Sequence, residues 1–186
     1  MFEFEKLNAS LPYALPEELE FIRQESLKLT QDNQIVMIGA GPAVFALAAL
    51  EQHPSPPNMT IIDLETFYYA EAHMRGAGID IDMVEFRTGD SSSIGLIWQT
   101  EKPIDLLIVD GDHSYRGVLK DLRAWGPQLK VGGVCFVHDI YWRVGGFNGS
   151  GEWLLADCAL AVEEECAVKG WEFLGRIGIG EAYRKV

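Results

Sequence analysis

Cysteine is scarce in this sequence, which contains three in 186 residues: Cys135, Cys158 and Cys166. They are odd in number and form no CxxC pair, so neither a disulfide framework nor a zinc knuckle is expected. No apolar run approaches the roughly 18 residues that a membrane-spanning helix needs. The first residues, MFEFEKLNAS, are acidic and do not resemble a signal peptide. We therefore expect a cytoplasmic protein without a membrane partner.

Positive charge is also scarce, because 15 Lys and Arg stand against 28 Asp and Glu, for a net charge of −13. Domains that bind nucleic acids usually carry a basic stripe that neutralises phosphates, and none is visible here. The same acidic charge repels anionic membranes. A neutral or cationic small molecule is therefore the expected substrate, and nucleic acid is not expected as a partner.

Short apolar runs alternate with helical patterns along most of the chain. The apolar runs cover Gln34–Ile38, Met59–Ile62, Met83–Phe86, Asp105–Val109 and Val134–Val137. The helical patterns cover Pro16–Leu29, Ala43–Gln52, Glu65–Arg75, Ser92–Thr100 and Tyr115–Trp125. The apolar runs lack the polar alternation of a strand with one exposed face, which favours strands buried on both faces. Strands alternating with helices predict a parallel sheet between two helical layers.

The remaining segments complete a single predicted domain. Residues 1–32 form an N-terminal helical extension, residues 33–140 the ligand-binding core, and residues 141–186 a C-terminal part. That last part contains a glycine-rich loop over 143–151, a helix over 152–169 and two apolar segments that fit a strand pair, Trp171–Ile177 and Glu181–Val186. The expected fold is a three-layer α/β/α sandwich whose mostly parallel sheet of seven strands ends in an antiparallel hairpin.

The segment IVMIGAGPAVFALAAL, residues 35–50, predicts a strand, a glycine turn and a helix. Gly39, Ala40 and Gly41 allow a tight turn and a close approach of the backbone to a ligand, and the following helix amides favour a nucleotide-type ligand. An ordinary strand-to-helix turn would also favour glycine. The turn contains no Lys, which excludes a nucleoside-triphosphate P-loop. It resembles the GAGPAG opening of flavin oxidoreductases, although Val44 replaces the third glycine.

A carboxylate at the end of the second expected strand supports a ribose-containing ligand. Asp63 lies 22 positions after Gly41, the offset at which such folds bind ribose hydroxyls. Leu64 follows it in the expected binding site, and Glu65 is a second candidate for the ribose contact. The alternative is that Asp63 only caps the next helix.

The most specific pattern lies over residues 104–139, IDLLIVDGDHSYRGVLKDLRAWGPQLKVGGVCFVHD. DGDH ends one strand, a helix follows, and a GG turn leads into a strand that ends in HD. Residues 84–90, VEFRTGD, end an earlier strand. Together these segments resemble class I S-adenosylmethionine-dependent methyltransferases, especially the O-methyltransferase branch. The resemblance spans about residues 30–140.

This resemblance implies a Rossmann-like methyltransferase fold, S-adenosylmethionine as cofactor and methylation of a hydroxyl on a small molecule or sugar. The implied cofactor contacts are Gly39 and Gly41 at the methionine part, Asp63 at the ribose, Asp90 and Ser91 at the adenine, and Asp110 beneath the sulfonium and the substrate.

The glycine turn departs from the family pattern at three positions. Met37 replaces a common acidic residue, Ala43 replaces the third glycine, and Pro42 before it cannot donate an amide hydrogen bond. Because of these departures, one alternative is a non-catalytic binding protein of the same fold. A second alternative, based on the GAGPA sequence, is a dinucleotide-binding oxidoreductase. The sequence also leaves open whether the N-terminal helix covers the cleft or mediates a homo-oligomer.

Methyl transfer to oxygen needs a general base or a divalent cation that lowers the pKa of the acceptor. Relatives hold magnesium at the ends of the fourth and fifth strands, where Asp110, His138 and Asp139 match by position. Because an imidazole suits a softer metal, both Mg²⁺ and Mn²⁺ are candidates. In the design without a metal, His113 is the expected general base and Asp112 the alternative. His113 also fits a packing role beside the next helix.

Overall fold

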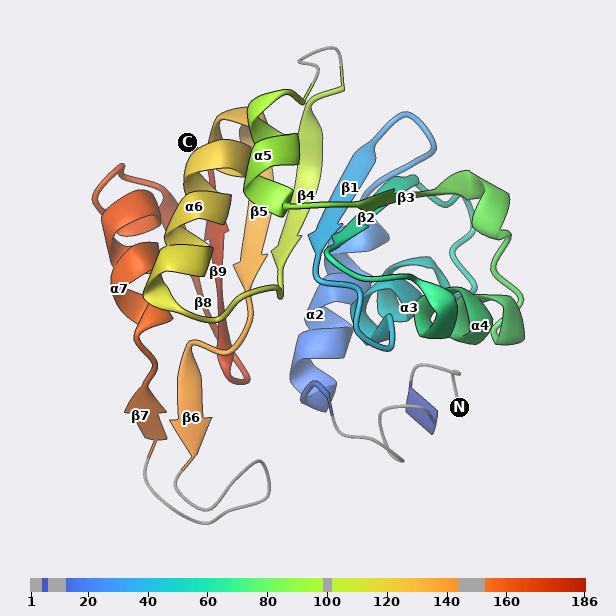
Figure 1. The fold of residues 1–186 in the computed structure, drawn as a ribbon, viewed down its shortest axis with the longest axis horizontal. Coiled ribbons are helices and arrows are strands. Elements are labelled where there is room, and N and C mark those ends of the chain that lie inside the picture. Colours follow the sequence, from blue (N-terminus) through green and yellow to red (C-terminus); the bar gives the residue numbers. More distant parts are fainter. Residues whose placement is uncertain (1–4, 7–12, 99–101, 144–152) are drawn as a thin grey trace.

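The computed structural model describes residues 5–6, 13–98, 102–143 and 153–186. One sheet of seven strands has the order β3-β2-β1-β4-β5-β9-β8, parallel from β3 to β5, with β9 antiparallel to β5 and β8 (Figure 1). The strands are β1 Gln34–Ile38, β2 Asn58–Asp63, β3 Val84–Thr88, β4 Ile104–Val109, β5 Leu129–Val137, β8 Glu172–Ile177 and β9 Gly180–Arg184. The predicted fold class is confirmed, antiparallel hairpin included.

Helices cover both faces of this sheet (Figure 1). The helices are α2 Pro16–Ser26, α3 Val44–Leu50, α4 Tyr68–Gly76, α5 Ser91–Leu96, α6 Tyr115–Trp125 and α7 Cys158–Val162. Short turns of other helical types lie at η1 Ile81–Met83, η2 Gly126–Gln128 and η3 Glu163–Ala167. One apolar cluster joins α2, α3 and α4 to the sheet, and a second joins α6 and α7 to its other face. None of the described helices has the length and apolar character needed to cross a bilayer.

The central strands are buried on both faces, as their sequences predict. Every residue of β1 and β4 is buried, so side chains pointing either way enter an apolar layer. Ile35 belongs to the first apolar cluster and its neighbour Val36 to the second, so successive side chains of β1 enter opposite helical layers. Such strands need continuous apolar sequence, because neither face meets water.

The register of the parallel strands brings their carboxyl ends level. Ile38 pairs with both Ile62 and Val109, and Val109 pairs with Val137. The residues that follow Ile38, Ile62, Val109 and Val137 therefore lie together at the carboxyl edge of the sheet. Open α/β sheets bind ligands at this edge, where the loops that follow the strands meet.

The C-terminal part differs from its prediction. The helix expected over 152–169 is replaced first by strand β7, Trp153–Leu155, which pairs with β6, Tyr141–Arg143, in a separate two-stranded sheet. Helix α7 begins only at Cys158 and continues into the wider turn η3. Apolar residues of a short segment fit a helix or a strand equally well, and a non-local strand pairing decides here.

Several helix bounds also differ from their predictions by a few residues. Helix α2 ends at Ser26, three residues before the expected Leu29, and α4 begins at Tyr68 instead of Glu65. Helix α5 begins at Ser91 and ends at Leu96, and the last residues of its predicted range, 99 and 100, lie outside the described residues. Helix ends depend on capping contacts that periodicity does not reveal.

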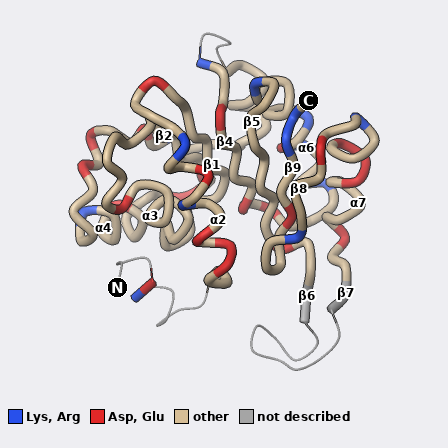
Figure 2. The backbone as a smooth tube through the Cα atoms, turned by 180° about the vertical axis from the view of Figure 1, so that it is seen from behind, with Lys and Arg blue, Asp and Glu red and all other residues tan. Residues whose placement is uncertain are grey.

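The acidic charge of the sequence is distributed over the whole fold. Figure 2 shows acidic positions on both helical sides of the sheet, with no continuous band of basic positions along the described part of the tube. The basic stripe typical of a nucleic-acid surface is therefore not seen among these residues.

Gly117 in α6 provides a test of the packing after β4. A Cβ at this position would lie 2.4 Å from the carbonyl oxygen of Asp112 and 2.5 Å from its Cβ, whereas a Cβ at Gly76 of α4 would meet nothing within 4 Å. We expect Gly117→Ala to lower the free energy of unfolding by about 1–3 kcal/mol, because the Asp112 turn must move. Gly76→Ala is the matched control and should leave stability unchanged or slightly raised. Urea unfolding measures the free energy of unfolding of both variants. Equal stability of the two would contradict the close contact between Gly117 and Asp112.

Candidate active site

One cavity of about 770 Å³ opens at the carboxyl edge of the sheet. This volume is in the range of small-molecule and cofactor sites. All residues that the sequence analysis assigned to a site line it: Gly39, Ala40, Gly41, Asp63, Leu64, Glu65, Asp90, Ser91, Asp110, Asp112, His113, His138 and Asp139. The ends of five parallel strands thus bring together residues that are up to 100 positions apart in the chain.

The glycine turn after β1 is held tightly against the end of β4. Gly39 has φ +85°, and a Cβ there would lie 2.0 Å from the carbonyl oxygen of Asp110, so no other residue fits. Ala43 has φ +65° although it is not glycine, and it is fully buried. The chain therefore adopts the left-handed conformation at the position where the resemblance predicts a third glycine. The carbonyl of Pro42 accepts a hydrogen bond from His73 Nδ1 at 3.0 Å, which steadies the turn.

The Asp63 carboxylate connects the turns after β1 and β2. Its Oδ2 accepts a hydrogen bond from the Ala40 amide at 2.7 Å, and its Oδ1 accepts one from the Glu65 amide at 3.2 Å. The alternative that Asp63 caps the next helix is wrong, because α4 begins at Tyr68 and its N-cap residue is Phe67. Asp63 is half-buried and faces the cavity, while Leu64 is 72% exposed at the rim.

The turn after β3 ends in a helix cap. Asp90 Oδ1 accepts hydrogen bonds from the Ser93 amide and the Ser92 hydroxyl, both at 2.7 Å. These hydrogen bonds from Ser93 and Ser92 hold the pKa of Asp90 below its ordinary value. The carboxylate is thus ionised and exposed at the cavity wall, beside Ser91.

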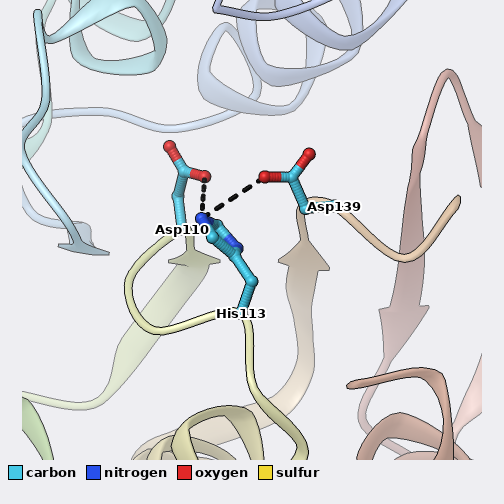
Figure 3. A group of neighbouring side chains, drawn as sticks. All are labelled: Asp110, His113 and Asp139. Atoms are coloured by element: carbon cyan, nitrogen blue, oxygen red, sulfur yellow. Dashed lines mark ion pairs between the residues drawn. The ribbon is translucent and has the colours of Figure 1, made fainter. Parts of the chain in front are cut away.

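Three side chains meet between the ends of β4 and β5 (Figure 3). His113 Nε2 lies 3.3 Å from Asp139 Oδ2 and 4.0 Å from Asp110 Oδ1. One ligand atom from each of the three lies within 4.8 Å of the others, close enough to hold one cation. Asp139 has φ +57°, and burial raises its pKa, while the two neighbouring histidines oppose this effect. A strained backbone and a perturbed carboxyl in a cavity are typical of a functional site.

His138 is buried next to this group, with 3% of its surface exposed. Its Nδ1 is 2.8 Å from Asp110 Oδ1 and its Nε2 is 3.3 Å from Glu18 Oε2. Burial lowers the pKa of His138, but the charges and hydrogen bonds of Asp110 and Glu18 outweigh burial and raise it well above its ordinary value. His138 thus pairs with Asp110 and Glu18, and the described side chains that come close enough to hold one cation are Asp110, His113 and Asp139, with His113 in place of the expected His138.

A family model described as a methyltransferase domain matches residues 36–140, which is more than half of the chain. The chain belongs to this methyltransferase family.

Solved structures support the same fold. A protein from Corynebacterium glutamicum has a TM-score of 0.72 at 17% identity and covers 98% of this chain and 88% of its own. The O-methyltransferase TomG from Streptomyces achromogenes, in complex with S-adenosylmethionine, has a TM-score of 0.68 at 15% identity, with 99% and 90% covered. An O-methyltransferase from Bacillus cereus, in complex with S-adenosylhomocysteine (SAH), has a TM-score of 0.68 at 16% identity, with 98% and 89% covered.

In this methyltransferase domain Asp112 forms the turn that leads into α6. Its Oδ1 accepts a hydrogen bond from the Ser114 amide at 3.0 Å, and hydrogen bonds from Ser114 hold its pKa below the ordinary value. Its side chain is exposed at the rim, whereas His113 points between the two other carboxylates (Figure 3). A carboxylate with a lowered pKa is a weak base, so His113 is the better candidate of the two.

The sequence analysis missed Glu18, a fully buried carboxylate of α2. It accepts hydrogen bonds from the Leu15 amide at 2.6 Å and the Ile179 amide at 2.8 Å, in addition to its contact with His138. It therefore joins the N-terminal helix and the β8–β9 turn to the centre of the methyltransferase site. The only sequence signal is the position of a Glu directly before Leu19 on the apolar face of the helix.

Glu18 gives a second prediction. We expect Glu18→Ala to lower the free energy of unfolding by about 3–5 kcal/mol, because it leaves a buried imidazolium with one carboxylate partner fewer. The matched control is Glu20→Ala on the same helix, whose carboxylate is exposed and accepts a hydrogen bond from Gln24. Thermal and urea unfolding compare the two variants. A Glu18→Ala protein as stable as Glu20→Ala would reject the contact.

Proposed function

We propose that this chain transfers a methyl group from S-adenosylmethionine to a hydroxyl group of a small molecule or sugar. The observation that carries the proposal is the meeting of Asp110, His113 and Asp139 in the same cavity as the glycine turn. This arrangement places groups that can activate a hydroxyl beside the turn that the family uses for its cofactor. The complexes of TomG with S-adenosylmethionine and of the Bacillus cereus enzyme with SAH support this cofactor.

The residues of the cavity fit S-adenosylmethionine. When bound, this cofactor supplies an electrophilic methyl group on a positively charged sulfur. Carboxylates at Asp63, Asp90, Asp110 and Asp139 face the cavity and suit a cation. The cofactor has no phosphate, so a glycine turn without Lys is sufficient. Asp63 can accept hydrogen bonds from ribose hydroxyls while it braces the Ala40 amide.

The chain can activate an acceptor hydroxyl through His113. Histidine is the most frequent general base in proteins, and this one lies between two carboxylates that orient its ring. The buried imidazolium of His138 donates to Asp110 Oδ1 at 2.8 Å and so fixes the direction of that carboxylate. Asp110 can thus align the acceptor and stabilise positive charge on His113 after proton transfer.

We also propose that the same three residues bind a divalent cation. Asp110 and Asp139 offer carboxylate oxygens and His113 offers a ring nitrogen. A cation held there would lower the pKa of the acceptor hydroxyl. The imidazole ligand favours Mn²⁺ over Mg²⁺. His113 cannot be both ligand and base, so metal dependence separates the two designs.

The acidic charge favours a small acceptor over a nucleic acid. The net charge is −13, and the cavity is lined by carboxylates from several strand ends. Binding to a phosphate backbone would need the opposite charge.

Calorimetry with S-adenosylmethionine, SAH, NAD and FAD tests the cofactor. We expect the two sulfur ligands to bind and the two dinucleotides not to bind. Asp63→Asn should weaken SAH binding at least about tenfold, because an ionised acceptor is lost while an oxygen remains for the Ala40 amide. Asp82→Asn, exposed in η1 and outside the cavity lining, is the control and should bind like wild type. Unchanged affinity of Asp63→Asn would reject the ribose contact. A folded protein that binds neither sulfur ligand would favour the non-catalytic alternative.

Mn²⁺ titration and turnover of an acceptor panel test the reacting centre. We expect His113→Ala to lower turnover about 100-fold or more in both designs, as measured by SAH release from phenol, catechol and sugar acceptors. If the metal design holds, wild type binds Mn²⁺, His113→Ala does not, and chelation abolishes turnover. If the general-base design holds, chelation leaves turnover unchanged. Full turnover by His113→Ala would overturn both designs.

A further inference from the structure

Two side chains of α6 hold the first residue of α5. Trp125 Nε1 donates to the carbonyl oxygen of Ser91 at 3.0 Å, and the Ser91 hydroxyl donates to Asp121 Oδ1. Asp121 and Trp125 lie four positions apart, on one face of the helix, and are 4% and 0% exposed. Helix α6 therefore contacts both the main chain and the side chain of Ser91, the residue at which the turn after β3 ends.

Asp121 is also next to the turn after β4 and lines the cavity. Its Oδ2 would lie 3.7 Å from a Cβ placed on Gly111. Among the described residues Asp121 has no ion pair with Lys or Arg. It is a buried carboxyl group in the cavity wall, and its hydrogen-bond partner is the hydroxyl of Ser91.

The surroundings of Asp121 make both of its protonation states accessible near neutral pH. Burial raises its pKa to about 6, opposed by the Ser91 hydrogen bond. The charged groups that face it are Asp90 at the start of α5 and Asp112 before α6, which raise the pKa further, and Lys120 on α6, which lowers it.

We propose that Asp121 is a positioning residue that sets whether the Ser91 hydroxyl accepts or donates a hydrogen bond in the cavity. An ionised Asp121 takes the Ser91 proton, so the Ser91 oxygen presents lone pairs to the ligand. When Asp121 gains a proton from solvent, it can donate to Ser91 Oγ, and the Ser91 hydrogen turns to the cavity.

The ionised state suits a ligand that presents an amino group, as adenine does at its N6 position. This inference rests on the proposed function and on the family resemblance, which implies that the adenine of S-adenosylmethionine lies at Asp90 and Ser91. The neutral state suits a carbonyl oxygen at the same position. The deaminated analogue S-inosylhomocysteine carries that oxygen and otherwise matches SAH.

The test is calorimetric binding of SAH and S-inosylhomocysteine to the full chain at pH 5.5 and pH 7.5. For wild type we expect SAH affinity to rise roughly threefold between the two values, because the ionised fraction of Asp121, at a pKa of about 6, rises about fourfold and one properly directed hydrogen bond is worth about tenfold. The affinity of the deaminated analogue should not rise. Asp121→Asn, which cannot ionise, should lose the pH dependence for SAH. Ser91→Ala should lose it too, and it keeps the test valid if Asp121→Asn does not fold.

The matched control is Asp82→Asn, the same chemical change at an exposed carboxylate of η1 that does not line the cavity. It should keep the pH dependence of wild type. SAH binding that is independent of pH in wild type, or that keeps its pH dependence in both Asp121→Asn and Ser91→Ala, would overturn the role of Asp121. A wild type that binds no SAH at either pH would instead refute the proposed function, and this inference with it.

Discussion

Backbone hydrogen bonds that continue the parallel ladder past the strand ends hold the whole site in place. The Gly39 amide donates to Ile62, the Asp110 amide to Ile38 and the His138 amide to Val109, at 2.8, 2.9 and 3.0 Å. Side chains of neighbouring strands therefore leave the sheet at one level. A slip of one residue in any of these strands would turn its functional side chain to the opposite face.

Charge burial is the second constraint on this site. Glu18, His138 and Asp110 form a line from the N-terminal helix to the cavity, with the imidazolium between two carboxylates. Such a group is tolerated inside a protein only when every charge has a partner, because an unpaired buried charge is strongly unfavourable. The structural anchor of α2 and the orientation of Asp110 thus depend on the same contact.

Helix α6 serves both the fold and the cavity. Its apolar face carries Val118, Leu122 and Trp125 into the core, while Asp121 on that face reaches the turn after β3. Its start packs against the Asp112 turn through Gly117. The helix therefore couples the two turns that face the adenine side of the proposed cofactor site.

The sequence alone determined the sheet, its helical layers and part of the cavity lining, because continuous apolar runs and glycine turns reflect local requirements. Strand ends in a parallel sheet meet at one edge, so Asp63, Asp110 and His113 could be placed there without a structure. Only the tertiary structure decided that His138 is buried against Glu18 and that Asp121 reaches Ser91. It also replaced part of the expected C-terminal helix by the β6–β7 pair. These features depend on contacts between residues far apart in the chain, and no local pattern records which distant side chain will face another.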